Sequence, residues 1–196
     1  MLLKEFLKSC SDVLLARGKM FVVLNGLFFV VVLASALVAS FVFVLPPLEE
    51  GTSVIQNGLF GDSWVLTFLF IFFSNLILSA FLVVTLPGLA FFVLSCLLLS
   101  YRSVFWGSLL AFSPISQFLA ALPTIVLEGE AYVIAAVAGT TLGLSWFKPN
   151  WVFRGESLSR REALVRAFKE CFSLYFWVVL VLFVAAIVET LTIYLL

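Results

Sequence analysis

Long uncharged runs of mostly apolar residues fill this chain, and short segments between them hold most of its charges. The runs cover residues 20–48, 63–101, 103–127, 131–147 and 171–188. A helix that crosses a bilayer needs about 20 apolar residues, so the pattern predicts spans at 20–44, 64–86, 88–110 and 172–195. Pro87-Gly88 is a turn signal between the second and third of these. The stretch 111–147 is long enough for one span or two.

The composition supports a membrane protein. Of 196 residues, 64% are hydrophobic and 11% are charged, whereas soluble domains are about half apolar and a quarter charged. A chain of this size cannot bury so much apolar surface in one aqueous core. We therefore expect one all-α membrane domain over residues 1–196, a polytopic helix bundle with the lipid bilayer as its partner. Disordered, secreted disulfide-rich and nucleic-acid-binding classes are excluded.

The charge distribution decides how often the chain crosses. Residues 1–19 hold four basic and two acidic side chains, residues 148–170 hold six and three, and residues 46–63 hold three acidic and no basic ones. Because basic segments stay cytoplasmic, an even number of spans must separate 1–19 from 148–170. The stretch 111–147 then crosses once, and Pro114–Leu127 is expected as a short re-entrant or broken helix in the outer half. The prediction is five spans in the cell membrane, with the N-terminus cytoplasmic and the C-terminus outside.

Two amphipathic segments flank the spans. In 1–19, apolar residues recur at helical spacing opposite charged ones, which predicts an inner-surface helix. These apolar residues are Leu3, Phe6, Leu7, Cys10, Val13 and Leu14. In 148–170, Ser159 and Glu162 have the spacing of a capping box, so a basic cytoplasmic loop and helix should lead into the last span. Each segment is either a surface anchor or a binding site for a partner.

Four polar residues inside the spans are candidate site residues: Asn75, Arg102, Glu128 and Glu189. Charged groups in the hydrocarbon are costly unless they pair or face a cavity. A rise of about 1.5 Å per residue places Arg102, Glu128 and Glu189 at one depth, which predicts a buried cluster of one cation and two carboxylates. Asn75 is expected to form an interhelical hydrogen bond, and Glu130 to reach the outer water.

A stripe of small residues follows Glu128 along the same predicted helix. Its members recur every four positions and are Ala131, Ala135, Gly139 and Gly143. Small residues at this spacing let another helix backbone approach closely. We therefore expect these four residues to pack helices together.

No pattern in the chain predicts catalysis, a metal site or a cofactor. The sequence has no His, which is the commonest general base and metal ligand. Cys10, Cys96 and Cys171 lack metal-ligand spacing, and there is no phosphate-binding loop or nucleophile elbow. The chain is thus expected not to be an enzyme, although two carboxylates from different spans could in principle do acid–base work.

Together these motifs resemble the stage II sporulation protein M family. Pro123, Glu128 and the small-residue stripe keep the spacing of its signature helix, with Thr124 and Ile125 replacing the family's His-Gly. Ser74-Asn75 resembles the Asn-Asn pair of its second span, and 185–189 resembles its Ala-Ala-x-x-Glu, whereas Arg102 departs from the family's Asn. The resemblance implies a membrane scaffold, since the family's namesake recruits peptidoglycan-degrading partners in spore formers.

Two functions are compatible with these features. A non-enzymatic scaffold or interaction protein, forming a homo-oligomer or binding other membrane proteins, follows from the small-residue stripe, the surface helices and the resemblance. The alternative is a small transporter, channel or permease subunit. It follows from the intramembrane polar residues and from the prolines at 114 and 123, because discontinuous helices with polar groups at depth build transport sites.

Overall fold

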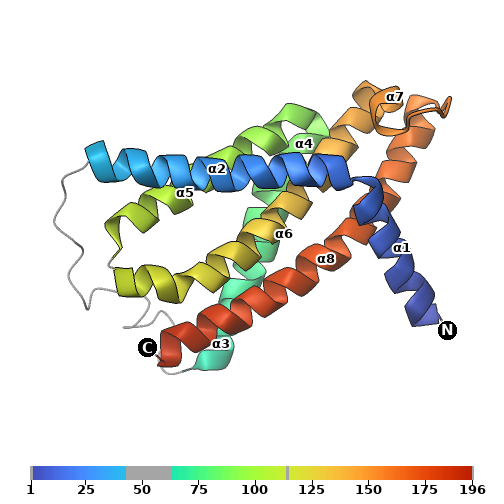
Figure 1. Cartoon of the computed structure of the whole chain (residues 1–196). Coiled ribbons are helices and arrows are strands. Elements are labelled where there is room, and N and C mark those ends of the chain that lie inside the picture. The colour runs from blue at the N-terminus through green and yellow to red at the C-terminus, as the bar shows by residue number, and fades with distance from the viewer. Residues whose placement is uncertain (1, 43–62, 114, 196) are drawn as a thin grey trace.

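The computed structural model of the chain describes residues 2–42, 63–113 and 115–195. Figure 1 shows the helices that it forms. They are α1 (Leu2–Ala16), α2 (Gly18–Val42), α3 (Trp64–Phe73), the π-helix η1 (Ser74–Thr85), α4 (Leu86–Ala90), α5 (Phe92–Phe112), α6 (Ile115–Phe147), α7 (Pro149–Val152) and α8 (Arg160–Leu195). Because α3, η1 and α4 follow one another without a break, we call them together the α3–α4 rod.

Five helical stretches within the described ranges are long and apolar enough to cross a membrane. They are α2, the α3–α4 rod, α5, residues 119–147 of α6 and residues 160–194 of α8. The all-α fold with five spans that hydropathy predicted is therefore confirmed, and the largest difference in boundaries is that the last stretch begins at residue 160 rather than 172.

The two basic segments meet at one end of the bundle. In Figure 1, α1, α7 and the first turns of α8 lie together on the right, and the C-terminus lies at the other end. Arg17, between α1 and α2, forms a salt bridge of 2.7 Å with Glu170 and donates a hydrogen bond of 2.6 Å to the carbonyl oxygen of Val152. An even number of spans thus separates the basic segments, as predicted. The acidic loop 46–63 lies outside the described residues except for Ser63.

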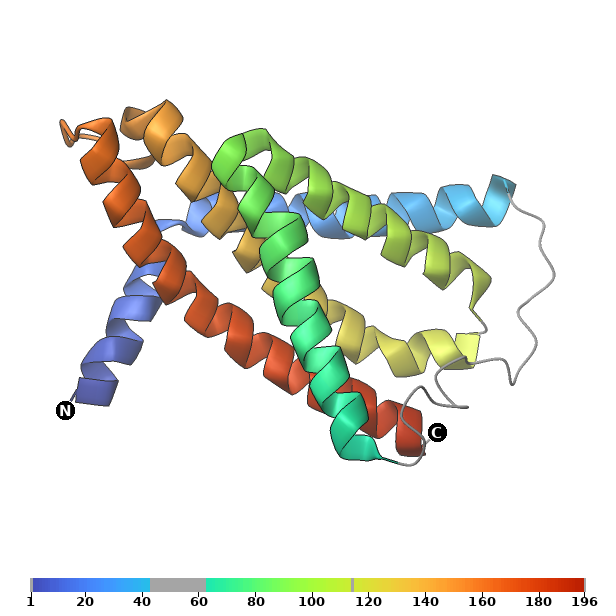
Figure 2. The same ribbon diagram turned by 180° about the vertical axis from the view of Figure 1, so that it is seen from behind.

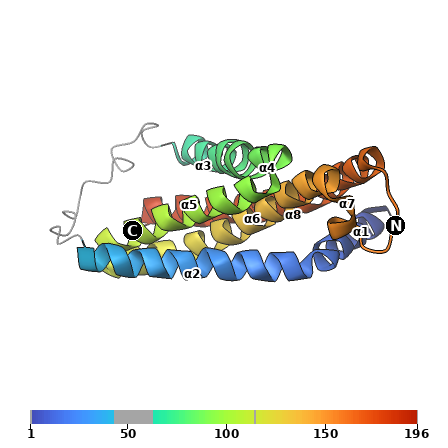
Figure 3. The ribbon, with the colours of Figure 1, turned by 90° about the horizontal axis from the view of Figure 1, so that it is seen from above.

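Helix α6 forms the core of the bundle. Every residue from Ala131 through Ser145 is buried. Viewed from above, α6 lies between the α3–α4 rod and α2 (Figure 3), and α8 packs along it. Seen from behind, the rod crosses over both α6 and α8 (Figure 2). The other helices therefore shield α6 from lipid over these turns.

Small residues bring α6 into backbone contact with its neighbours. A Cβ atom on Gly139 would lie 2.7 Å from the carbonyl oxygen of Thr85, and one on Gly143 would lie 2.8 Å from the backbone nitrogen of Phe92. The Thr85 hydroxyl donates a 2.9 Å hydrogen bond to the carbonyl of Ala135. The stripe thus serves contacts within this chain, against the α3–α4 rod and the start of α5.

The first half of α6 differs from the sequence prediction. A separate re-entrant or broken helix was expected over Pro114–Leu127, but α6 runs continuously from Ile115 with Pro123 inside it. Figure 1 shows that the helix bends. A proline within a helix removes one backbone hydrogen bond and crowds the preceding turn, which accounts for a bend without a break. The segment that follows residue 114 is therefore one end of a long helix.

The turn after the rod also lies later than predicted. Pro87 and Gly88 sit inside α4, directly after η1, where the proline has no N–H and cannot continue the backbone hydrogen bonds of the preceding π-helix. The chain turns at Phe91, whose backbone is extended with φ −151° and ψ 118°. Gly88 is required for packing, because a Cβ atom there would lie 2.7 Å from the carbonyl carbon of Gly139.

The amphipathic helix predicted at the N-terminus is present as α1. It runs across the direction of α2 (Figure 1) and lays its apolar face on α8. Cys10 on that face is fully buried, and the rings of Phe6 and Phe176 pack edge to face with centroids 5.4 Å apart. The apolar face of α1 is thus covered at least in part by protein.

Candidate functional site

Glu128 is the most deeply buried charged residue that the structure describes, with 1% of its surface exposed. It lies on α6 between the bend at Pro123 and the fully buried segment. Two side chains hold it. The Asn75 amide donates to Oε1 of Glu128, and the Tyr132 hydroxyl lies 3.2 Å from Oε2. A buried carboxyl group needs such partners because burial removes its hydration.

Asn75 reaches Glu128 from the π-helix η1. Its side-chain oxygen lies 2.9 Å from the Tyr132 hydroxyl. Each of the three side chains therefore contacts the other two, and we call this arrangement the Asn75–Glu128–Tyr132 ring. π-Helical turns are rare in proteins, and those that occur are frequently at functional sites. The position of Asn75 on η1 therefore supports the ring as a candidate functional site.

Arg102 joins the ring from α5. Its Nη2 donates to the Tyr132 hydroxyl at 2.9 Å. Its Cζ lies 4.8 Å from the centroid of the Tyr132 aromatic ring. Among the described residues, Arg102 forms no ion pair within 4 Å of a carboxylate. The sequence predicted a buried cluster of Arg102 with the two glutamates. In the structure Tyr132 lies between Arg102 and Glu128, and the charges of these two residues interact at longer range.

Glu189 completes the group from α8. Its carboxyl group interacts with that of Glu128 through charge. One of its oxygens, Oε2, is buried without a hydrogen-bond partner, and so is Nε of Arg102. The structure thus brings Asn75, Arg102, Glu128 and Glu189 together from four helical segments.

Sequence reasoning missed Tyr132, the residue that touches three of the others. Tyr132 is fully buried on α6, one helical turn after Glu128. Residues four apart lie on the same helix face, so the pair Glu128 and Tyr132 was the signal that could have revealed it.

Glu130 lies elsewhere than predicted. Instead of reaching the outer water, its carboxylate accepts a 2.7 Å hydrogen bond from the amide of Asn25, in the first third of α2. The prediction estimated depth by counting residues along a straight helix parallel to the membrane normal. It failed because α6 runs obliquely to α2 (Figure 1). Asn25 is a second residue that the sequence analysis did not single out.

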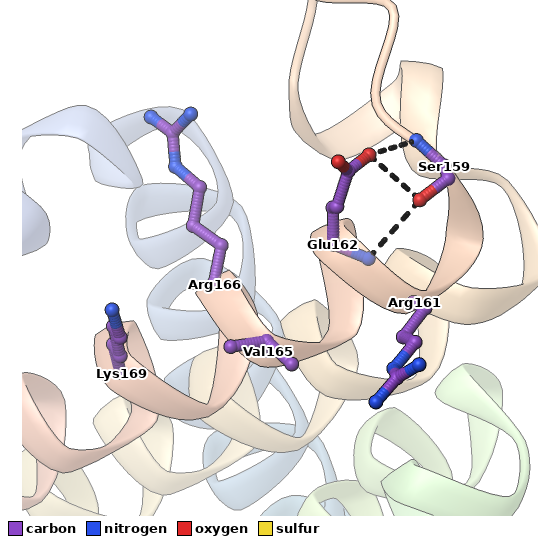
Figure 4. Close-up of a pocket in the computed structure, with 6 residues that line it drawn as sticks. All are labelled: Ser159, Arg161, Glu162, Val165, Arg166 and Lys169. Atoms are coloured by element: carbon purple, nitrogen blue, oxygen red, sulfur yellow. Dashed lines mark hydrogen bonds between the residues drawn. The ribbon is translucent and has the colours of Figure 1, made fainter.

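Charged side chains line two open hollows at the end that carries the basic segments. One hollow, of about 600 Å³, lies on the first turns of α8 and is shown in Figure 4. The second, of about 480 Å³, lies between α1 and α8. Arg166 borders both hollows and pairs with Glu156 and Glu170.

The capping box predicted at the start of α8 is confirmed. The Ser159 hydroxyl and backbone N–H donate to the Glu162 carboxylate at 2.7 and 2.9 Å, and the Glu162 N–H points back to the hydroxyl at 3.4 Å (Figure 4). These hydrogen bonds, the one from the Ser159 side chain foremost, lower the pKa of Glu162 because they favour its charged form.

No group of three or more His, Cys, Asp and Glu side chains in the described part of the chain could hold a metal ion. The chemistry that the buried site does offer is that of two carboxyl groups, one guanidinium, one amide and one phenol. These groups can hold one another, a proton or a small polar solute.

The helices and the polar group they enclose define the class of this chain, a polytopic α-helical membrane protein with a hydrogen-bonded network in its interior. Comparison with protein families identifies the family within this class. Residues 20–192 match the family of Stage II sporulation protein M, and the chain belongs to that family. Comparisons with curated proteins and with solved structures gave no match.

Proposed function

We propose that this chain is a non-enzymatic membrane scaffold, a protein that holds other membrane proteins or further copies of itself. The main support is the pair of charged hollows on α1 and α8, because they offer polar contacts outside the bilayer that the chain leaves open. Membership of the Stage II sporulation protein M family agrees with this role, since the namesake of the family is expected to recruit partners.

The hollow between α1 and α8 is the better candidate for contact with a partner. Glu5, Lys8, Ser9 and Asp12 line it from α1, and Arg166 and Glu170 line it from α8. The α1 side chains are exposed. Mixed charges at the rim of an interface mainly favour the correct partner over wrong ones, so this hollow suits a charged segment of another protein.

The small-residue stripe does not contribute to this proposal. Ala135, Gly139 and Gly143 contact the chain's own rod and α5, so this face is unavailable to a second subunit. Assembly would instead use the surface formed by α1 and the start of α8.

Photo-crosslinking in native membranes tests the scaffold proposal. A photoreactive residue at Ser9, in the hollow, should give discrete adducts with another protein or a second copy. The matched position is Phe41 on α2, which is 82% exposed and should give lipid adducts. Lys8→Glu should abolish the Ser9 adducts by reversing one charge of the hollow. If Ser9 gives no protein adduct, or if Lys8→Glu leaves the adducts intact, the scaffold proposal fails.

A second candidate function, a small transporter or permease subunit, is favoured by the polar group around Glu128. Nε of Arg102 and Oε2 of Glu189 are buried without partners, and buried polar atoms without partners are candidates for contact with a polar solute. Solute flux in proteoliposomes that Glu128→Gln abolishes, while the fold persists, would favour this function over the scaffold.

We further propose that the chain lies in the cell membrane with α1 and α7 in the cytoplasm and the C-terminus outside. The basic residues at that end support this orientation. Reporter fusions at the two termini test it. An N-terminal reporter should be active only if it functions in the cytoplasm and a C-terminal one only if it functions outside, and the reverse pattern would contradict the orientation.

A further inference from the structure

The three contacts of the Asn75–Glu128–Tyr132 ring need a certain number of protons, which can be compared with the number that the side chains supply. One contact joins the Asn75 amide nitrogen to Oε1 of Glu128. The second joins the Tyr132 hydroxyl to the Asn75 side-chain oxygen at 2.9 Å, and the third joins the same hydroxyl to Oε2 of Glu128 at 3.2 Å. Each contact needs one proton between its two heavy atoms to be a full hydrogen bond, since a proton shared by two acceptors gives two weaker ones.

Asn75 and Tyr132 together provide only two of the three protons. The Asn75 side chain turns its nitrogen to one neighbour and its oxygen to the other, so it donates to one contact. The Tyr132 hydroxyl has a single proton and donates to one more. If Glu128 were ionised, two oxygen atoms would face each other in the remaining contact with no hydrogen between them. Exchanging the nitrogen and oxygen of the Asn75 amide moves that contact but leaves the count unchanged.

We propose that Glu128 binds a proton in the folded protein and that this proton closes the ring. The Glu128 carboxylic acid then donates to the Tyr132 oxygen, Tyr132 donates to Asn75, and Asn75 donates back to Glu128. The Tyr132 oxygen has a second lone pair, which accepts the 2.9 Å hydrogen bond from Arg102. Every polar atom of the ring is then satisfied, as buried polar groups require.

The charges around the ring favour one proton on the two carboxyl groups Glu128 and Glu189, and the contacts of the ring assign that proton to Glu128. Arg102 on α5 is a cation, Glu189 on α8 interacts with Glu128, and Asn75 on η1 is uncharged. On the α2 side, Asn25 is engaged by Glu130 of α6 itself. With one of the two carboxyl groups neutral, the charge of Arg102 balances that of the other. With both ionised, the group would hold an uncompensated negative charge, which is costly inside a membrane.

Glu128 is therefore a proton-binding site within the bundle, at the point where η1, α5, α6 and α8 meet. Removing the proton opens the ring and weakens the contact between η1 and α6. This inference holds for a scaffold and for a transporter alike, because it depends only on the contacts of the ring.

Infrared difference spectroscopy of the full chain in bilayers tests the site directly. At neutral pH the wild type should show the carbonyl stretch of a buried protonated carboxylic acid, and Glu128→Gln should remove that band. The matched control is Glu130→Gln, two positions away on the same helix, which should leave the band unchanged. Absence of the band from the wild type, or its loss in Glu189→Gln while it persists in Glu128→Gln, would overturn the proposal.

Thermal unfolding gives an independent readout. Glutamine has the shape of a protonated glutamic acid, with a donor nitrogen in place of the acid hydroxyl and an acceptor oxygen, so Glu128→Gln should keep the ring and unfold at the wild-type temperature at neutral pH. As pH rises, the wild type should lose the proton and unfold at lower temperatures, while Glu128→Gln should not change. If Glu128→Gln is as unstable as Glu128→Ala at neutral pH, the ring does not contain a neutral acid.

Discussion

Substitution of Gly143 by alanine tests how closely α6 packs against its neighbours. The new Cβ would lie 2.8 Å from both the backbone nitrogen and the Cα of Phe92, and it would also meet the carbonyl oxygen of Gly88. All three are backbone atoms, which cannot rotate away, so the helices must separate. Overpacking of this kind costs about 1–3 kcal/mol, and the rigid neighbours place Gly143→Ala at the upper end.

The matched control is Gly26→Ala on α2, where an added Cβ meets nothing within 4 Å. Alanine is favoured over glycine in a helix by about 1 kcal/mol, and this gain applies to both variants. The difference between them therefore isolates the packing term and should be about 1–3 kcal/mol. Titration of the purified variants with a denaturing detergent measures this difference in unfolding free energy. Equal stability of the two variants would refute the close contact of α6 with α4 and α5.

Three further predictions concern side chains away from this contact. Tyr132→Phe should lower the unfolding free energy by about 1–3 kcal/mol, because it leaves buried partners unsatisfied, whereas Tyr101→Phe, 65% exposed, should not change it. Arg17→Ala should cost about 3–5 kcal/mol because it breaks a largely buried ion pair, and the exposed Lys19→Ala should cost little; both are measured by thermal unfolding. The lowered pKa of Glu162 means that its cap stabilises α8 above the ordinary carboxyl pKa and is lost as pH falls through the lowered value. Amide protection in the first turn of α8, measured relative to the intrinsic exchange rate at each pH, should fall over that acidic range and should stay constant in Glu162→Gln.

Hydropathy was sufficient to predict the five spans because the bilayer imposes a length on each helix. The capping box at Ser159 was predictable for a similar reason, since it depends on residues close together in sequence. The small-residue stripe identified a packing face, but the sequence could not say whether its partner lay in the same chain. The structure places Gly139 and Gly143 against Thr85 and Phe92 of the same chain, which no local pattern encodes.

The sequence was sufficient to predict most residues of the site but not the hydrogen bonds that join them. Asn75, Arg102, Glu128 and Glu189 stand out because polar residues are rare in spans. Tyr132 does not stand out, since tyrosine is ordinary in a membrane helix, yet it bridges Arg102 to the rest. Depth also failed as a guide for Glu130, because residue counting assumes that helices are straight and parallel to the membrane normal.

Native mass spectrometry of the protein extracted with its surrounding lipid most directly tests the central claim, that this chain works by holding other proteins. We expect assemblies heavier than one chain with its lipids, and Lys8→Glu should reduce them to single chains while the fold is retained. Single chains alone from the wild type, extracted under conditions that preserve the fold, would contradict it.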